Sequence, residues 1–123
     1  MALRAGVDLM EILRLQEAIE RHGERFFARI FTPAERTLCA GSYSSLAARF
    51  AAKEAVSKVL GTGIGEVAWI DMEILRSETG APTLTLHGKA RQLAEELELT
   101  EWAISLSHSR DMAIAMVVAQ GRK

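Results

Sequence analysis

Apolar residues recur along the chain with two periods, and each period predicts a different kind of element. Apolar positions three or four residues apart mark helices over 11–22, 46–60 and 89–97, because this spacing brings them onto one helical face. The apolar stripe of the first helix consists of Ile12, Leu15, Ala18 and Ile19. Gly23 is expected to end that helix. The middle helix is apolar nearly all round, which is typical of a buried helix.

Alternation of apolar and polar residues predicts the strands. It marks a strand over 67–75, followed after a turn by a short strand over 83–86. The inward face of the first of these should carry Ile70, Met72 and Ile74. A mostly apolar stretch at 2–7 is expected to form a strand that runs into the first helix, and the last segment predicts a hairpin with arms at 101–109 and 112–119. The fold class that follows is α+β, with a mixed or antiparallel sheet packed on one side by the first and middle helices.

Short polar signals mark the starts of the helices. Thr32 followed by Pro33 is typical of an N-cap and the first helical position, and Ser42 is expected to begin the middle helix. Asp8 followed by Glu11 has the spacing of a capping box. An acid at a strand-to-helix junction can also hold a metal ion on a rigid element, so Asp8 has two interpretations.

The middle helix carries charges where a buried helix should have none. At about 100° per residue, Arg49, Lys53 and Ser57 share one polar strip, and Glu54 and Lys58 share a second strip bordered by apolar side chains. Such charges must be paired, bound to a metal or open to a wet cleft. Glu54 and Lys58 could form an ordinary ion pair, favourable by only about 0.2–0.5 kcal/mol. Alternatively, Glu54 could bind Mg²⁺ and Lys58 a phosphate held by that metal, which would require a second carboxylate elsewhere.

Two further segments could contact an anion. The glycine-rich stretch at 61–65 leaves backbone amides accessible, although a helix C-cap followed by a loop explains the same residues. Alternation places His108 on the face that also carries Trp102, Ile104 and Leu106. His108 could therefore be a core residue, but the neighbouring hydroxyls of Ser107 and Ser109 make an anion contact the alternative.

The composition limits the class of protein. With 123 residues, of which 49% are hydrophobic, the chain can bury one core, so we expect a single domain over 1–123. Fifteen Lys and Arg against sixteen Asp and Glu leave a net charge of −1, which argues against generic binding to nucleic acid or membrane surfaces. Cys39 is the single cysteine and is expected to pack as a small hydrophobe. No signal peptide or membrane-spanning run is visible, so a cytoplasmic location is expected.

Five segments of the chain form a pattern when taken together: Gly6-Val7-Asp8, FFARIFTPAE at 26–35, RFAAKEAVSKVLGTGIG at 49–65, Gly80-Ala81-Pro82 and SLSHSRDMAIA at 105–115. With these segments the chain resembles the holo-(acyl-carrier-protein) synthases, the small trimeric phosphopantetheinyl transferases. The resemblance runs nearly end to end. It implies transfer of the phosphopantetheine arm of coenzyme A to a serine of apo acyl carrier protein for fatty acid biosynthesis, with release of adenosine 3′,5′-bisphosphate.

The resemblance implies a role for each candidate site residue. Asp8 and Glu54 would bind Mg²⁺ or Mn²⁺, Lys58 would contact the reacting phosphates, and these three would be catalytic. Either Glu54 or a metal-ordered water would accept the proton of the carrier serine. The expected coenzyme A contacts are Lys53, Gly61, Gly63, Gly80, Pro82, Ser107, His108 and Ser109. Of these, the glycine–proline turn would line the adenine pocket, and the last three residues would lie on the 3′-phosphate side.

Partners are also implied. Arg14 and Arg21 lie seven residues apart on a basic edge of the first helix, which is usually a solvated face, whereas the resemblance implies that they dock the acidic carrier protein. It further implies a homotrimer with each coenzyme A between two subunits.

Two positions depart from the family pattern. Arg4 stands where the family strand is usually apolar or Gly, and Ala81 stands where the turn often carries Lys. A trimeric domain that binds a nucleotide or partner without catalysis is the alternative function. The intact carboxylates and Lys58 argue against that alternative.

Overall fold

The computed structural model describes residues 3–62 and 65–121 and has the predicted α+β architecture. In chain order the elements are β1 (Leu3–Glu11), α1 (Ile12–Ile30), α2 (Pro33–Cys39), α3 (Tyr43–Val59), the 3₁₀ turn η1 (Trp69–Asp71), β2 (Met72–Arg76), β3 (Pro82–Leu86), α4 (Gly88–Glu96), β4 (Glu101–His108) and β5 (Met112–Gln120). Within the described part of the chain, no helix is long and apolar enough to cross a membrane.

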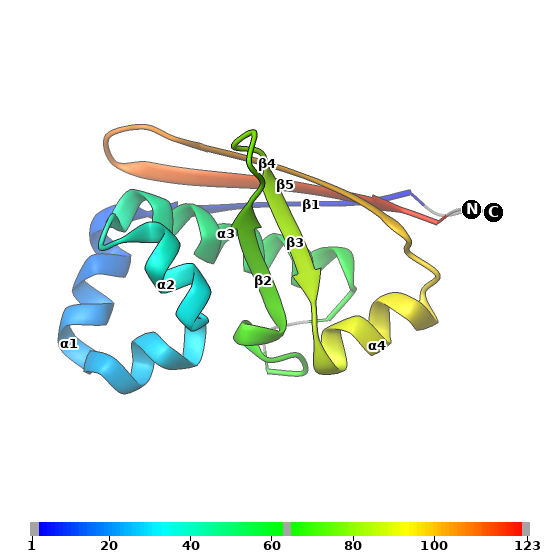
Figure 1. Ribbon diagram of the computed structural model, residues 1–123, viewed down its shortest axis with the longest axis horizontal. Helices are drawn as coiled ribbons and strands as arrows, with labels where there is room; N and C mark the ends of the chain where they lie inside the picture. The colour runs from blue at the N-terminus through cyan, green and yellow to red at the C-terminus, as the bar shows by residue number, and fades with distance from the viewer. Residues whose placement is uncertain (1–2, 63–64, 122–123) are drawn as a thin grey trace.

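A three-stranded antiparallel sheet of order β1–β5–β4 forms one side of the molecule, and the helices lie on its other side (Figure 1). The central strand β5 turns small side chains inward, since Ala113, Ala115, Val117 and Ala119 are all buried. α3 lies against this face and turns its own alanines toward it. Small residues on both surfaces let the helix approach the sheet closely, so α3 becomes the centre of the core.

The prediction of one sheet containing all the strands is wrong, because β2 and β3 form a separate antiparallel pair. Side chains from the helices occupy the free edge of β2. The amide of Ile74 donates to Oε2 of Glu35 at 2.7 Å, and the carbonyl of Ile74 accepts from Nε of Arg49 at 3.0 Å. An edge strand that is already hydrogen-bonded by side chains does not need a neighbouring strand.

The N-terminal strand is longer than predicted, and this changes the role of Asp8. Pairing with β5 continues to Glu11, so Asp8 lies within β1 opposite Ala115 and is not the N-cap of a helix. The capping-box prediction is therefore wrong. The N-cap of α1 is Glu11, whose side chain makes no capping bond.

Two other boundaries differ from the prediction. Gly23 breaks the helical geometry of α1, with φ of 81°, but the chain resumes a helical path as far as Ile30. The strand predicted over 67–75 begins only at Met72, since η1 precedes it. Met72 and Ile74 are fully buried as expected, whereas Ile70 is 43% exposed.

The predicted starts of the two following helices are confirmed. Thr32 and Glu35 form a reciprocal capping box at α2, with Pro33 in the first turn. The Ser42 hydroxyl accepts from the amide of Ser45 at the start of α3. The C-terminal hairpin and the buried Cys39 are also confirmed.

Candidate active site

Asp8 lies against α3 because β1 contacts this helix closely at Gly6, two residues earlier on the same face of the strand. A Cβ on Gly6 would lie only 2.3 Å from the carbonyl oxygen of Ala55, closer than such atoms approach in proteins. Only glycine therefore lets the strand and the helix pack at this distance. Because side chains two residues apart share a face of a strand, Asp8 points toward α3 as well.

The side chain of Lys58 reaches from α3 across to β1. Its Nζ donates to Oδ1 of Asp8 at 3.0 Å and to the carbonyl oxygen of Val7 at 2.9 Å. The ion pair of Lys58 is thus with Asp8, and the surface pair with Glu54 considered from the sequence is not the one that forms. Asp8 is only 18% exposed whereas Lys58 is 55% exposed, so the ammonium lies at the open side of the site.

Glu54 lies close enough to Asp8 for the two carboxyl groups to interact. Burial, hydrogen bonding with the Asp8 carboxyl group and its negative charge raise the pKa of Glu54 to about 7, against an opposing effect of the Lys58 ammonium. Two carboxylates this close repel one another unless a proton or a cation lies between them. A metal ion bound between them would therefore displace that proton.

The chemistry of these donors fits Mg²⁺ or Mn²⁺. Mg²⁺ is usually held by one or two carboxylates, with water and substrate phosphates completing its octahedron. Among residues 3–62 and 65–121, no three His, Cys, Asp or Glu side chains come together to form a protein-only metal cage. A metal bound by Asp8 and Glu54 would thus retain positions for phosphate oxygens.

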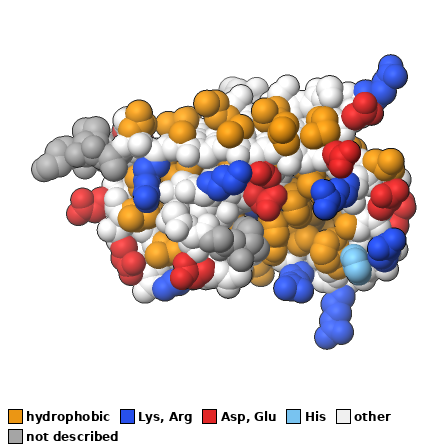
Figure 2. All heavy atoms as spheres, turned by 180° about the vertical axis from the view of Figure 1, so that it is seen from behind, with side chains coloured by type: hydrophobic (Ala, Val, Ile, Leu, Met, Phe, Trp, Pro, Cys, Tyr) orange, Lys and Arg blue, Asp and Glu red, His pale blue; other side chains and the backbone are white. Residues whose placement is uncertain are grey.

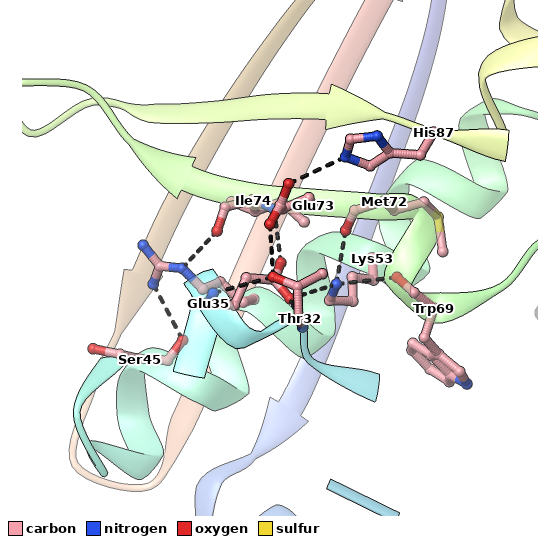
Figure 3. Close-up of polar contacts among 10 residues, drawn as sticks. Thr32, Glu35, Ser45, Lys53, Trp69, Met72, Glu73, Ile74 and His87 are labelled. Carbon is pink, nitrogen blue, oxygen red and sulfur yellow. Dashed lines mark hydrogen bonds and ion pairs between the residues drawn. The ribbon is translucent and has the colours of Figure 1, made fainter. Parts of the chain in front are cut away.

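Lys53, one residue before Glu54, points in another direction. Its side chain is completely buried, and Nζ donates to Oε1 of Glu35 at 2.9 Å, to the carbonyl of Trp69 at 3.0 Å and to that of Met72 at 2.7 Å (Figure 3). These three bonds use all three N–H donors of an ammonium group. No donor is left for a coenzyme A phosphate, so we remove Lys53 from the predicted binding residues.

Glu35 is the centre of this buried network. Besides Lys53, its carboxylate accepts from the amides of Thr32 and Ile74, which ties α2, α3 and β2 together (Figure 3). The other two residues of this polar strip are also buried: Arg49 bonds to backbone carbonyls, and the Ser57 hydroxyl donates to the carbonyl of Glu54. The polar strip of Arg49, Lys53 and Ser57 is therefore structural, and the strip of Glu54 and Lys58 faces the candidate site.

The remaining predicted coenzyme A contacts do not converge within one chain. Gly61 follows α3 near Arg4, at one end of β1, whereas Ser107 lies level with Leu9 at the other end. Ser107, His108 and Ser109 are exposed at the β4–β5 turn, so the core interpretation of His108 is wrong. Gly80 lies in the β2–β3 turn and Pro82 begins β3, whereas Gly63 lies outside the described residues.

Arg14 and Arg21 are exposed on α1, as predicted, and the structure adds a hollow further along α1 that sequence analysis missed. The hollow has a volume of about 460 Å³ and is lined by His22, Arg25, Phe26 and Arg29. Arg25, Phe26 and Arg29 lie three or four residues apart after the break at Gly23, so a second helical segment there would have revealed this face. The rear view shows hydrophobic side chains on the α1 side of the molecule, bordered by Lys, Arg and a His (Figure 2).

Comparison with known proteins accounts for this arrangement. The model of the 4′-phosphopantetheinyl transferase superfamily matches residues 4–117. Holo-[acyl-carrier-protein] synthase of Moorella thermoacetica is 50% identical, over 96% of this chain and 94% of that protein, and the same enzyme of Herpetosiphon aurantiacus is 50% identical, over 97% and 99%. The crystal structure of Helicobacter pylori holo-[acyl-carrier-protein] synthase in complex with coenzyme A superposes with a TM-score of 0.86 at 35% identity, covering 94% of this chain and 99% of that one. The chain therefore belongs to the holo-[acyl-carrier-protein] synthases of the 4′-phosphopantetheinyl transferase superfamily.

Proposed function

We propose that the protein transfers the 4′-phosphopantetheine group of coenzyme A to a serine of apo acyl carrier protein, for fatty acid biosynthesis in the cytoplasm. The observation that carries the proposal is the meeting of Asp8, Glu54 and Lys58 between β1 and α3. Two carboxylates and one ammonium at an open edge suit a diphosphate substrate that arrives with a divalent metal ion.

In the proposed reaction, the serine oxygen forms a bond to the β-phosphorus of coenzyme A, and the bond from that phosphorus to the bridging oxygen breaks. Adenosine 3′,5′-bisphosphate leaves with the electron pair of the broken bond. Asp8 and Glu54 would hold Mg²⁺ or Mn²⁺, which when bound offsets negative charge on the diphosphate. Lys58 supplies a second positive charge to the leaving phosphate, because its exposed ammonium can turn from Asp8 toward a ligand. The serine proton passes to Glu54 or to a water beside it.

We further propose a homotrimer with coenzyme A bound between subunits. The sheet face opposite α3 supports this, since it exposes a band of large apolar side chains along β1 and β5. The exposed members are Leu3, Val7, Leu9, Ile114 and Met116. A continuous apolar band of this kind marks an interface. The separation of Gly61 from Ser107 within one chain also supports a binding site completed by a second subunit. Light scattering at assay concentrations tests the trimer, and an active monomer would refute it.

For the carrier protein, we propose α1 as the docking surface. Arg14 and Arg21 would be extended by Arg25 and Arg29 around the exposed hollow. Cationic side chains around a partly apolar hollow suit an acidic helix that also offers apolar side chains. This surface is separate from the metal-binding carboxylates, so docking and chemistry can be altered independently.

The transfer reaction is tested by incubating the protein with coenzyme A, Mg²⁺ and an apo acyl carrier protein and weighing the carrier by mass spectrometry. The carrier mass should increase by one phosphopantetheine group, and the increase should disappear with a chelator or with a carrier whose acceptor serine is replaced by alanine. Coenzyme A binding without any mass increase would favour the alternative of a non-catalytic binding domain.

A further inference from the structure

Arg4 is a partly buried cation on the same face of β1 as Gly6 and Asp8. Its guanidinium turns toward the end of α3, where Nη2 lies 3.6 Å from the position that a Cβ on Gly61 would occupy. Gly61 comes three residues after Lys58 and has φ of 76°, which favours glycine. Arg4 therefore lies beside the first residue of the loop that leaves α3.

The charge of Arg4 has no partner in the part of the chain that the structure describes. Every other described arginine either is exposed or bonds to the protein. Of the two that are not exposed, Arg36 pairs with Glu24, and Arg49 bonds to backbone carbonyls. For Arg4 the structure gives neither an ion pair nor a hydrogen bond. Since a partly buried charge is normally compensated, an anion from outside the chain is the natural partner.

The position of Lys58 shows which anion can reach Arg4. The Cβ of Lys58 lies 3.3 Å from where a Cβ on Gly6 would be, and its Nζ extends toward Asp8. Along β1, the two cations therefore lie on either side of Gly6, Arg4 before it and the Lys58 ammonium beside Asp8 after it. Arg4 and Asp8 are four strand residues apart, about 13 Å along β1. The side chains of Arg4 and Lys58 are long, so the distance that a ligand must span between the two cations is shorter than this. A ligand with several phosphates can contact both cations.

We propose that Arg4 binds a phosphate of the adenosine 3′,5′-bisphosphate half of coenzyme A. This inference rests on the proposed function. Under that function Lys58, with a metal ion held by Asp8 and Glu54, would lie at the reacting diphosphate, and Arg4 binds the ligand further along β1. The planar guanidinium can offer two parallel N–H donors to a phosphate, which an ammonium cannot do.

A purely structural role would have a different consequence. The C-terminal end of a helix carries partial negative charge. Under this alternative, Arg4 stabilises the last turn of α3 and binds no ligand. In that case its removal would lower the melting temperature and leave ligand affinity unchanged.

The test is isothermal titration calorimetry with adenosine 3′,5′-bisphosphate and with coenzyme A, in Mg²⁺ and well below the melting temperature. Arg4→Gln should weaken both affinities about tenfold, or about 1.4 kcal/mol. Arg4→Lys should recover part of the loss, because charge is kept while the two-donor geometry is lost. The matched control is Arg91→Gln. Arg91 is exposed on α4, where it pairs with Glu95. Titration of the wild type and Arg4→Gln with adenosine 5′-phosphate then identifies the phosphate that Arg4 contacts. If Arg4 contacts the 3′-phosphate, both proteins should bind this ligand equally well. If Arg4 contacts the 5′-phosphate, Arg4→Gln should bind it more weakly.

Affinities of Arg4→Gln within about twofold of the wild type, with or without a lower melting temperature, would overturn the proposal. The outcome is separable from that of the proposed function, because binding is measured without a carrier protein. If the wild type bound no coenzyme A, both proposals would fail. If the wild type bound coenzyme A and the Arg4 variants bound it equally well, only the Arg4 proposal would fail.

Discussion

Replacement of Lys53 by Met tests whether the buried network of α3 is structural. Met keeps most of the apolar stem and removes the ammonium group. The Glu35 carboxylate would remain buried without its counter-charge, and the carbonyl oxygens of Trp69 and Met72 would lose a donor. Burial already lowers the pKa of Lys53, and the charge of Glu35 opposes that effect. The negative charge of Glu35 therefore favours the charged form of Lys53.

The magnitude follows from this environment. Removing one partner of a fully buried ion pair costs about 3–5 kcal/mol, a large part of a total stability of about 5–15 kcal/mol. With an unfolding entropy of about 2.1 cal/mol/K per residue, a chain of 123 residues should melt about 12–19 °C lower. The double variant Lys53→Met with Glu35→Gln should recover part of that loss, because the uncompensated charge is gone.

The assay is thermal unfolding followed by circular dichroism at one fixed protein concentration, since assembly makes melting concentration-dependent. Lys89→Met, at an exposed position, is the control. Below its melting temperature, Lys53→Met should retain normal affinity for coenzyme A, because the wild-type side chain is not exposed. A melting temperature within about 3 °C of the wild type would refute the reasoning, as would a selective loss of coenzyme A binding without loss of stability.

Three further predictions concern packing, protonation and docking. Gly6→Ala should destabilise the fold by about 1–3 kcal/mol and lower kcat, because the new methyl group separates β1 from α3; normal melting together with normal kcat would contradict the close contact. The folded pKa of Glu54, about 7, lies above its unfolded value of 4.5, so its stabilising contribution is present below pH 4.5 and lost as pH rises through about 7. As pH rises from 4.5 to about 7, metal-free wild type should accordingly lose stability relative to Glu54→Gln. Over the same range, the affinity of the wild type for Mg²⁺, measured by calorimetry, should rise. A pH-independent affinity would exclude competition between Mg²⁺ and the Glu54 proton. Arg14→Glu should raise KM for the carrier protein and flatten its salt dependence while KM for coenzyme A stays unchanged, unlike Arg91→Glu; identical carrier curves for wild type and Arg14→Glu would remove Arg14 from the docking surface.

Local signals predicted the starts of α2 and α3 and the strip of α3 that carries Glu54 and Lys58. The Thr32 capping box depends on residues three positions apart, so its geometry could be predicted without tertiary structure. The strips of α3 follow from the helical period alone, which separated Glu54 and Lys58 from Lys53. The pairing of Glu54 with Asp8 required the family resemblance, because 46 residues separate them and no local pattern reports their contact.

The features that escaped prediction depend on long-range contacts. The family resemblance places Lys53 among the coenzyme A contacts. The sequence does not reveal that Glu35 and two carbonyls surround this side chain. The separate β2–β3 pair has the same cause, since Glu35 reaches the edge of β2 from another helix. The helical turn after Gly23 was missed for a different reason, because a glycine with positive φ can either end a helix or join two helical segments.

We propose that Asp8 and Glu54 form the metal-binding centre of phosphopantetheine transfer. The most direct measurement is the rate at which a carrier protein gains phosphopantetheine mass with Asp8→Asn, Glu54→Gln and wild type, in coenzyme A and Mg²⁺. Each variant should melt as a folded protein of wild-type oligomeric state and transfer at least about 100-fold more slowly, because a neutral amide is a poor metal ligand. Transfer by either variant at a near wild-type, Mg²⁺-dependent rate would contradict the claim.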